Sequence, residues 1–218
     1  MSINQQQYAA TPLIQSGTTT AADASYTAPT NATVGVVAVA PSAGARIDNI
    51  DFTTLGTSVA GLVRLWTCEG TPGPVISSIT SVTTTATVNT ATNHNLITGD
   101  LISVQGAFPV EYNVRAVAVT VVSATSFTYT IVSTGGVAAL AVGEFSSTHT
   151  APVYHLLAEF PVVAVTGSST QRAFNLGLDT QSNSDFMPIV LPGGHSLRTT
   201  VSVTQTNALR AVARGGSF

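Results

Sequence analysis

The chain has 218 residues, of which only 8% are charged, and its formal net charge is −3. All seven basic residues are Arg and they are scattered, so no basic stripe could replace the counterions of a nucleic acid. The absence of any run of 18 apolar residues excludes a membrane-spanning helix, and a single cysteine excludes an intrachain disulfide.

The composition predicts a folded chain that is largely covered by other protein. Hydrophobic residues make up 44% of the sequence, a balance opposite to that of disordered chains. So little charge leaves a free monomer poorly soluble. We therefore expect a homo-oligomer, with a trimer as the first hypothesis, or a larger assembly. The N-terminus lacks the basic and apolar regions of a signal peptide, which predicts synthesis in the cytoplasm.

Residues 1–33 are polar and low in complexity. Because they contain few large apolar side chains, this segment alone cannot bury enough surface to offset its ordering entropy. Two interpretations stay open: a flexible tail, or an arm that orders on a neighbouring subunit.

Short β-branched segments then follow one another closely, separated by turn sequences. The first strands are expected at 34–40, 46–52 and 62–69, and an irregular apolar alternation in the second predicts a bulge. Residues 153–161 are the expected hairpin partner of 62–69. The later strands are expected at 171–178, 186–191, 196–203 and 208–213. About eight strands without helical periodicity predict an all-β antiparallel sandwich, most simply a jelly roll.

Between residues 76 and 148 the sequence changes to shorter strands rich in Ser, Thr and Val. Strands are expected at 77–88, 101–104, 114–123 and 126–132, with a hairpin turn at 122–126. Residues 138–145 are expected to return to the parent sheet. Such short strands favour a small β-barrel inserted in a hairpin loop, because loop tips tolerate insertions. The parent sandwich is then discontinuous, over 34–75 and 149–218.

The most specific stretch of the inserted domain is His94-Asn95-Leu96-Ile97-Thr98-Gly99-Asp100-Leu101-Ile102-Ser103-Val104, followed by Tyr112-Asn113. Gly99 suits a turn with positive φ, and Asp100 can bond the nearby backbone. The stretch resembles the small β-barrel module related to the first catalytic-cysteine half-domain of ubiquitin-activating enzymes, which recurs as an insertion in bacteriophage virion proteins. This resemblance covers roughly residues 76–145 and implies a structural spacer or decoration domain. It implies no ubiquitin chemistry, because the only cysteine, Cys68, lies outside the module.

Four parent segments are also similar to segments of small virion proteins of tailed phages: Leu62–Trp66, Tyr154–Val162, Leu191–Arg198 and Gly215–Phe218. The two resemblances together imply a virion structural protein of the head decoration, or cement, class. Its expected partner is the major capsid protein and its expected location the head surface. The alternative is a tail or fibre component that binds a host receptor or glycan.

Among the residues that could carry chemistry, none is predicted to be catalytic or to bind a cofactor or a metal. The four histidines (94, 149, 155 and 195) lack metal-ligand spacing, and no second thiol exists. His94 is expected to bond backbone in its turn, His155 to have a structural role and His195 to lie in a surface turn. Cys68 is expected to be a buried, inert thiol.

Two carboxylate pairs, Asp48 with Asp51 and Glu69 with Glu159, are the arrangements that would suit glycosidase-type acid–base chemistry. Acids are scarce and nothing else converges on these pairs, so an enzyme such as a depolymerase is not expected. The paired glycines at 193–194 and 215–216 lack the lysine and following helix of a phosphate loop. Trp66 is expected in the core, whereas exposed aromatics in a groove would favour sugar binding.

Overall fold

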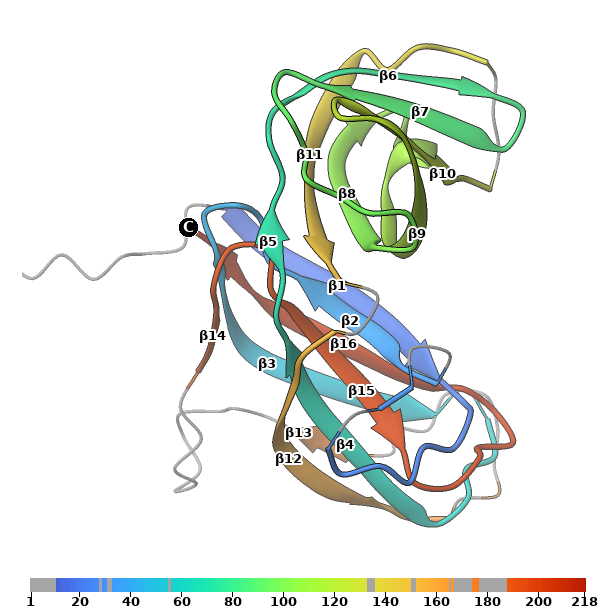
Figure 1. Ribbon diagram of the computed structural model, residues 1–218. Helices are drawn as coiled ribbons and strands as arrows, with labels where there is room; N and C mark the ends of the chain where they lie inside the picture. Colours follow the sequence, from blue (N-terminus) through green and yellow to red (C-terminus); the bar gives the residue numbers. More distant parts are fainter. Residues whose placement is uncertain are drawn as a thin grey trace, which may run out of the picture. The chain divides into compact units, whose positions relative to one another are not determined.

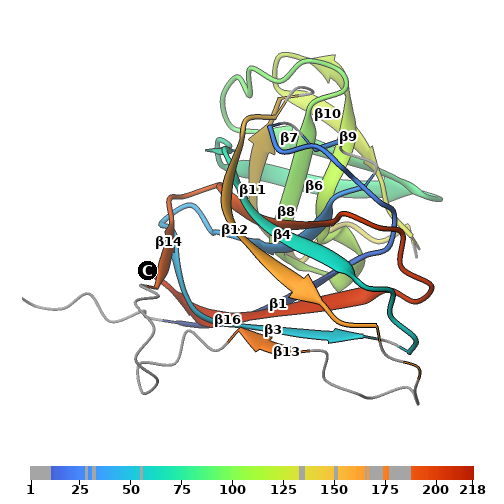
Figure 2. The same cartoon turned by 90° about the horizontal axis from the view of Figure 1, so that it is seen from below.

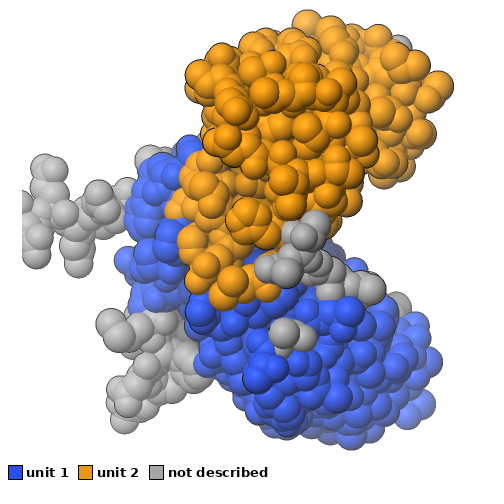
Figure 3. Space-filling view, viewed as in Figure 1, with its two compact units in different colours: residues 1–68, 154–192, 196–218 blue, residues 69–153, 193–195 orange. Residues whose placement is uncertain are grey.

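The computed structural model describes residues 11–27, 29–30, 33–54, 56–132, 136–149, 152–164, 166, 174–176 and 188–218. These residues form β-strands and one short 3-10 turn, η1 (Val110–Tyr112), which confirms the predicted all-β class (Figure 1). Two compact units are present (Figure 3). Unit 1 comprises residues 1–68, 154–192 and 196–218, and unit 2 comprises residues 69–153 and 193–195. Across the described ranges, no helix is long and apolar enough to cross a membrane.

Unit 1 is a sandwich of two antiparallel sheets. The first has the order β1-β16-β3-β13, with β14 also paired to β3, and the second has the order β12-β4-β15-β2. The strands are β1 (Thr11–Thr19), β2 (Gly35–Val39), β3 (Ala45–Thr54), β4 (Gly61–Cys68), β12 (Tyr154–Val162), β13 (Phe174–Leu176), β14 (Ile189–Leu191), β15 (Ser196–Val201) and β16 (Leu209–Ser217). Figure 2 shows β1, β16, β3 and β13 together in one layer.

The pairing in unit 1 is that of a long antiparallel ribbon folded over itself. β1 pairs with β16, β2 with β15, β3 with β13 and β14, and β4 with β12. Pairing from the two chain ends inward is the jelly-roll arrangement that the strand pattern predicted. The hairpin between β4 and β12 confirms the expected partnership of residues 62–69 with 153–161, and unit 2 occupies the chain between these strands.

The core of unit 1 lies between its two sheets. Apolar side chains alternate along the strands and interdigitate there, including Ile47, Phe52, Leu65, Leu197 and Val201. The expected bulge is present in β3, where the register against β16 shifts between Asn49 and Ile47. At this shift β16 has Gly215, where a Cβ would lie 1.8 Å from the carbonyl oxygen of Arg46, so only glycine allows the close approach.

Residues 11–19 differ from the expectation of a flexible tail or an arm on a neighbour. They form β1, which pairs with β16 of the same chain over its whole length. The Gln15 side chain extends this order by accepting a hydrogen bond from Val39 N and donating one to Val39 O. Backbone pairing thus orders a strand of which only Leu13 adds a large side chain to the core. Residues 1–10 lie outside the described residues.

Unit 2 is a curled, barrel-like antiparallel sheet in the order β5-β11-β8-β9-β10-β7-β6. Its strands are β5 (Thr71–Pro72), β6 (Ile76–Val82), β7 (Thr85–Thr90), β8 (Leu101–Phe108), β9 (Val114–Ser123), β10 (Ser126–Thr130) and β11 (Ala141–Thr148). The backbone N–H of Ala139 donates to Ile79 O, which brings the segment before β11 against β6, the far edge strand. The unit has its own core, which includes Ile102, Phe127 and Phe145.

Two expectations for unit 2 are wrong. Residues 77–88 form a hairpin of β6 and β7 instead of one strand, with Thr83 at a φ of 52° in the turn. A run of Ser, Thr and Val contains no Gly or Pro to indicate such a turn. Residues 138–145 do not return to the parent sheet: β11 pairs with β8, and burial of Phe145 in the core of unit 2 holds it there.

The expected hairpin turn at 122–126 is confirmed by the pairing of Ser123 with Ser126.

The loop after β12 is only partly described. The strand expected at 171–178 is seen over 174–176 as β13, and the one expected at 186–191 is seen as β14; the remainder of both predictions lies outside the described residues.

Candidate functional site

The two carboxylate pairs do not form acid–base pairs. Asp48 is exposed and lies 2.6 Å from Arg46, while the buried Asp51 forms an ion pair with Arg214. Glu159 lies opposite Arg64 in the β12–β4 register and bonds it. The expectation that Glu159 faces Glu69 is therefore wrong, because the register sets the two apart along the hairpin.

His94 has the expected role in its turn. Its Nδ1 accepts a hydrogen bond from Leu96 N at 3.0 Å, and its Nε2 lies 2.9 Å from Ser123 O, to which it donates. The adjacent turn is also as expected: Gly99 has a φ of 99°, and Asp100 Oδ2 accepts a hydrogen bond from Ile97 N at 3.0 Å. The side chains of His94 and Asp100 thus hold the 94–104 stretch in place through hydrogen bonds to backbone groups.

The other singled-out side chains are dispersed. His155 is exposed on β12, His195 is half-buried after the turn at 193–194, and Cys68 is a buried thiol outside any disulfide, as expected. Within the described ranges, no three His, Cys, Asp or Glu side chains come close enough to hold a metal ion.

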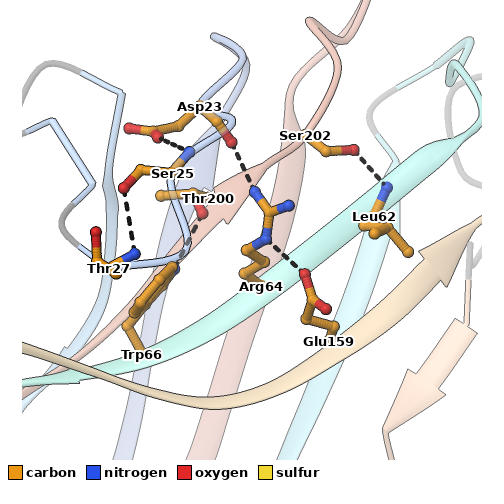
Figure 4. Close-up of polar contacts among 9 residues, drawn as sticks. All are labelled: Asp23, Ser25, Thr27, Leu62, Arg64, Trp66, Glu159, Thr200 and Ser202. Atoms are coloured by element: carbon orange, nitrogen blue, oxygen red, sulfur yellow. Dashed lines mark hydrogen bonds and ion pairs between the residues drawn. The ribbon is translucent and has the colours of Figure 1, made fainter.

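A buried cluster of polar and aromatic side chains lies on the outer face of the β12-β4-β15-β2 sheet (Figure 4). Arg64 and Trp66 alternate along β4 with Val63 and Leu65, which belong to the core between the sheets, so they project to the opposite face. Sequence reasoning expected Trp66 to be buried, which is confirmed, but not this second buried layer. The sequence feature that could have indicated this layer is Arg64, an arginine in the middle of an otherwise apolar strand.

Arg64 is the centre of this cluster, with its residue only 2% exposed. Its Nε donates to Glu159 Oε1 at 2.6 Å and its Nη1 to Asp23 O at 2.8 Å, and its guanidinium lies 4.0 Å from the ring centroid of Tyr26. Burial alone would lower the pKa of Arg64, but hydrogen bonds with Glu159 and Tyr26 outweigh it and raise the pKa. A permanently charged Arg64 therefore fastens the segment after β1 onto the sheet.

Trp66 is enclosed beside Arg64. Its Nε1 donates to Thr200 Oγ1 at 3.0 Å, and its ring meets that of Tyr154 edge-on at 6.2 Å. The Tyr154 hydroxyl accepts a hydrogen bond from the buried Arg198 at 2.9 Å. With no face of the indole open to solvent, Trp66 provides no stacking platform for a sugar.

Asp23 orders the segment that covers Arg64. Its carboxylate accepts hydrogen bonds from Ser25 N at 2.9 Å, from Thr30 N at 2.7 Å and from Thr33 Oγ1 at 2.6 Å. Burial alone would raise the pKa of Asp23, but these hydrogen bonds outweigh it and hold the pKa below its ordinary value.

The Asp23→Asn variant is expected to be less stable by about 1–2 kcal/mol at pH 7, because bonds to a charged acceptor are stronger than those to an amide. Because the pKa of Asp23 is lower in the folded state than in the unfolded chain, the ionised carboxylate stabilises the folded state above about pH 3.9, the ordinary pKa of Asp. This stabilisation is lost as the pH falls through the lower, folded-state pKa. Urea unfolding followed by Trp66 fluorescence should therefore show the gap between wild type and variant closing below about pH 4. A gap that stays constant from pH 6 to pH 3 would contradict this role for Asp23.

Exposed apolar side chains gather at one end of unit 2, named here the apolar end and comprising Val82, Phe108, Val110, Val137 and Leu140. Leu140 N donates to Phe108 O at 2.8 Å, and the buried Tyr112 hydroxyl bonds both Ser81 Oγ and Val137 O, so the five residues are neighbours. Leu140 is 80% exposed. A group of exposed apolar side chains on neighbouring residues is typical of an interaction site.

The apolar end lies away from the points where the chain enters and leaves unit 2. In the β8–β11 pairing, Phe108 is opposite Ala141 at the apolar end, whereas Leu101 is opposite Thr148 next to the exit of the chain. Seven residues of strand separate these positions, a distance of about 23 Å at the usual rise. The apolar end thus lies at the opposite end of β8 and β11 from the exit of the chain.

A scan against protein-family models, a search of curated proteins and a search of solved structures each find no match to this chain.

Proposed function

We propose that the chain is a non-enzymatic structural protein of a tailed-bacteriophage virion, of the head decoration class. In this role the jelly-roll unit is the rigid body, and unit 2 provides a contact to the major capsid protein or to a neighbouring copy. The observation that carries the proposal is the apolar end of unit 2, because uncovered Phe108, Val110 and Leu140 need a protein partner.

Composition and the resemblance of the 94–113 stretch support the same role. A chain with 8% charged residues relies on assembly more than on charge to stay in solution. Binding of many copies stabilises a shell by mass action, since each copy that binds only the assembled lattice adds its binding free energy to the assembled state. The apolar contact would act as the central anchor of each interface.

The Phe108→Ser/Leu140→Ser variant tests this proposal. Its affinity for particles assembled without this chain is expected to fall at least tenfold, because truncating a buried anchor costs about 2 kcal/mol or more. Co-sedimentation with the particles gives the affinity. The Val75→Ser/Val122→Ser variant is the matched control, since both valines are exposed in unit 2 outside the apolar end, and it should bind as wild type does.

Equal binding of the wild type and the Phe108/Leu140 variant would overturn the assignment of the contact. Cryo-EM of intact particles tests the location independently. Density for this chain on the head surface supports the decoration role, whereas density only on the tail would replace it with the tail or fibre role.

A further inference from the structure

Unit 2 contains a cavity of about 420 Å³, a size typical of small-ligand sites. Its lining residues all belong to unit 2 and come from residues 69–74, the 93–100 turn, residues 147–149 and 152–153, and His195. The charged side chains among them are the carboxylates of Glu69 and Asp100, and no arginine is among the lining residues that the structure describes. The cavity therefore favours a positively charged occupant.

Two of the lining residues each have a buried oxygen atom without a hydrogen-bond partner among the described residues: Asp100 Oδ1 and Thr148 Oγ1. Asp100 is only 2% exposed, and its other carboxylate oxygen already accepts from Ile97 N. The imidazole Nδ1 of His149 lies 3.7 Å from Oδ1, which is beyond hydrogen-bond distance. Buried polar atoms ordinarily have partners, so this pair of acceptors indicates a donor that binds here.

His149 and His94 differ in their freedom to respond to a ligand. Both ring nitrogens of His94 are engaged with backbone, so this ring is part of the wall. The His149 side chain is 85% exposed and can leave its place beside Asp100 with little loss of packing. An incoming N–H donor can then take that place at Oδ1.

We propose that this cavity binds a cationic N–H donor, a guanidinium or an alkylammonium group, through Asp100 Oδ1 and Thr148 Oγ1. A guanidinium or an ammonium group carries several N–H bonds and can donate to both acceptors, and its charge offsets the carboxylates of Asp100 and Glu69. A metal ion is less suitable, because the described residues offer no group of three charged or imidazole ligands. This proposal does not depend on the virion role, because the groups that line the cavity determine the ligand whichever assembly the chain joins.

The test is an NMR titration of the full chain at pH 8. The probes are N-acetyl-arginine methylamide, its uncharged isostere N-acetyl-citrulline methylamide, and ethylguanidinium chloride. Saturable amide shifts at Asp100, Thr148 and His149 are expected with the arginine compound, with at least tenfold weaker binding of the citrulline compound. Equal affinity for arginine and ethylguanidinium would indicate a free small cation, whereas tighter arginine binding would indicate a side chain of a partner protein.

Variants assign the binding to these atoms. Asp100→Asn should weaken the arginine compound about tenfold and Thr148→Val about threefold, as expected for loss of a charged and a neutral acceptor. Thr85→Val, at an exposed threonine of β7 outside the cavity, should leave binding unchanged. If Asp100→Asn fails to fold, Thr148→Val still decides the matter. Equal shifts with citrulline, no saturable shift with any probe, or unchanged binding by Thr148→Val would overturn the proposal.

Discussion

Replacing Arg64 by alanine is expected to lower the free energy of unfolding of unit 1 by about 3 kcal/mol. Loss of one partner of a buried ion pair costs about 3–5 kcal/mol. The lower end applies here, because the side chain of Glu159 is 31% exposed and water can still reach the charge that is left behind. The variant also loses the contact with Tyr26 and the hydrogen bond to Asp23 O, which together hold the covering segment on the sheet.

Urea unfolding followed by fluorescence measures this effect directly, because Trp66 is the only tryptophan and lies beside Arg64 in the buried cluster. Arg64→Lys should recover only part of the loss, since an ammonium cannot bond Glu159 and Asp23 O in the same forked geometry. Arg210→Ala is the control: Arg210 is exposed on β16, and its loss should change stability by less than about 0.5 kcal/mol. A loss of less than about 1 kcal/mol in Arg64→Ala would contradict the proposed role of the cluster.

Replacing Phe127 by alanine is expected to destabilise unit 2 by about 3–5 kcal/mol, the usual cost of removing a fully buried aromatic ring. Phe127 has no exposed surface, and its ring packs against His94 at 5.3 Å and against Phe145 at 5.2 Å. It therefore joins the turn motif to the core of the curled sheet. The cavity left by alanine would lie at the centre of this unit.

Amide hydrogen exchange of β7 and β10, the strands that pair through Phe127 and Val88, is the suitable measurement. Protection should fall by more than a hundredfold in Phe127→Ala and by less in Phe127→Leu, which keeps part of the volume. Phe108→Ala is the matched control, because Phe108 is exposed and its loss should leave exchange in these strands unchanged. Unchanged protection in Phe127→Ala would show that the ring is not central to the unit.

Local patterns were sufficient for much of this fold. Alternation and turn residues predicted the all-β class, the β4–β12 hairpin and the bulge in β3. They also predicted the backbone role of His94 and the burial of Trp66. Except for the β4–β12 pairing, these features depend on residues a few positions apart or on the amount of apolar side chain in a strand, and both can be read along the chain. The pairing of β4 with β12 was predictable because the apolar strand pattern resumes after the inserted segment.

Other features depend on pairs that only folding brings together. β1 is ordered by backbone bonds to β16, nearly 200 residues later, and no side-chain pattern in residues 11–19 records that pairing. The register between β4 and β12 places Glu159 opposite Arg64 rather than near Glu69. The segment after β1 provides further partners of Arg64, including Asp23 O. The unpartnered oxygens of Asp100 and Thr148 likewise come from a turn and a strand end 48 residues apart. Side-chain alternation along the chain thus identified much of the apolar core, but strand register and long-range packing decided which residues meet.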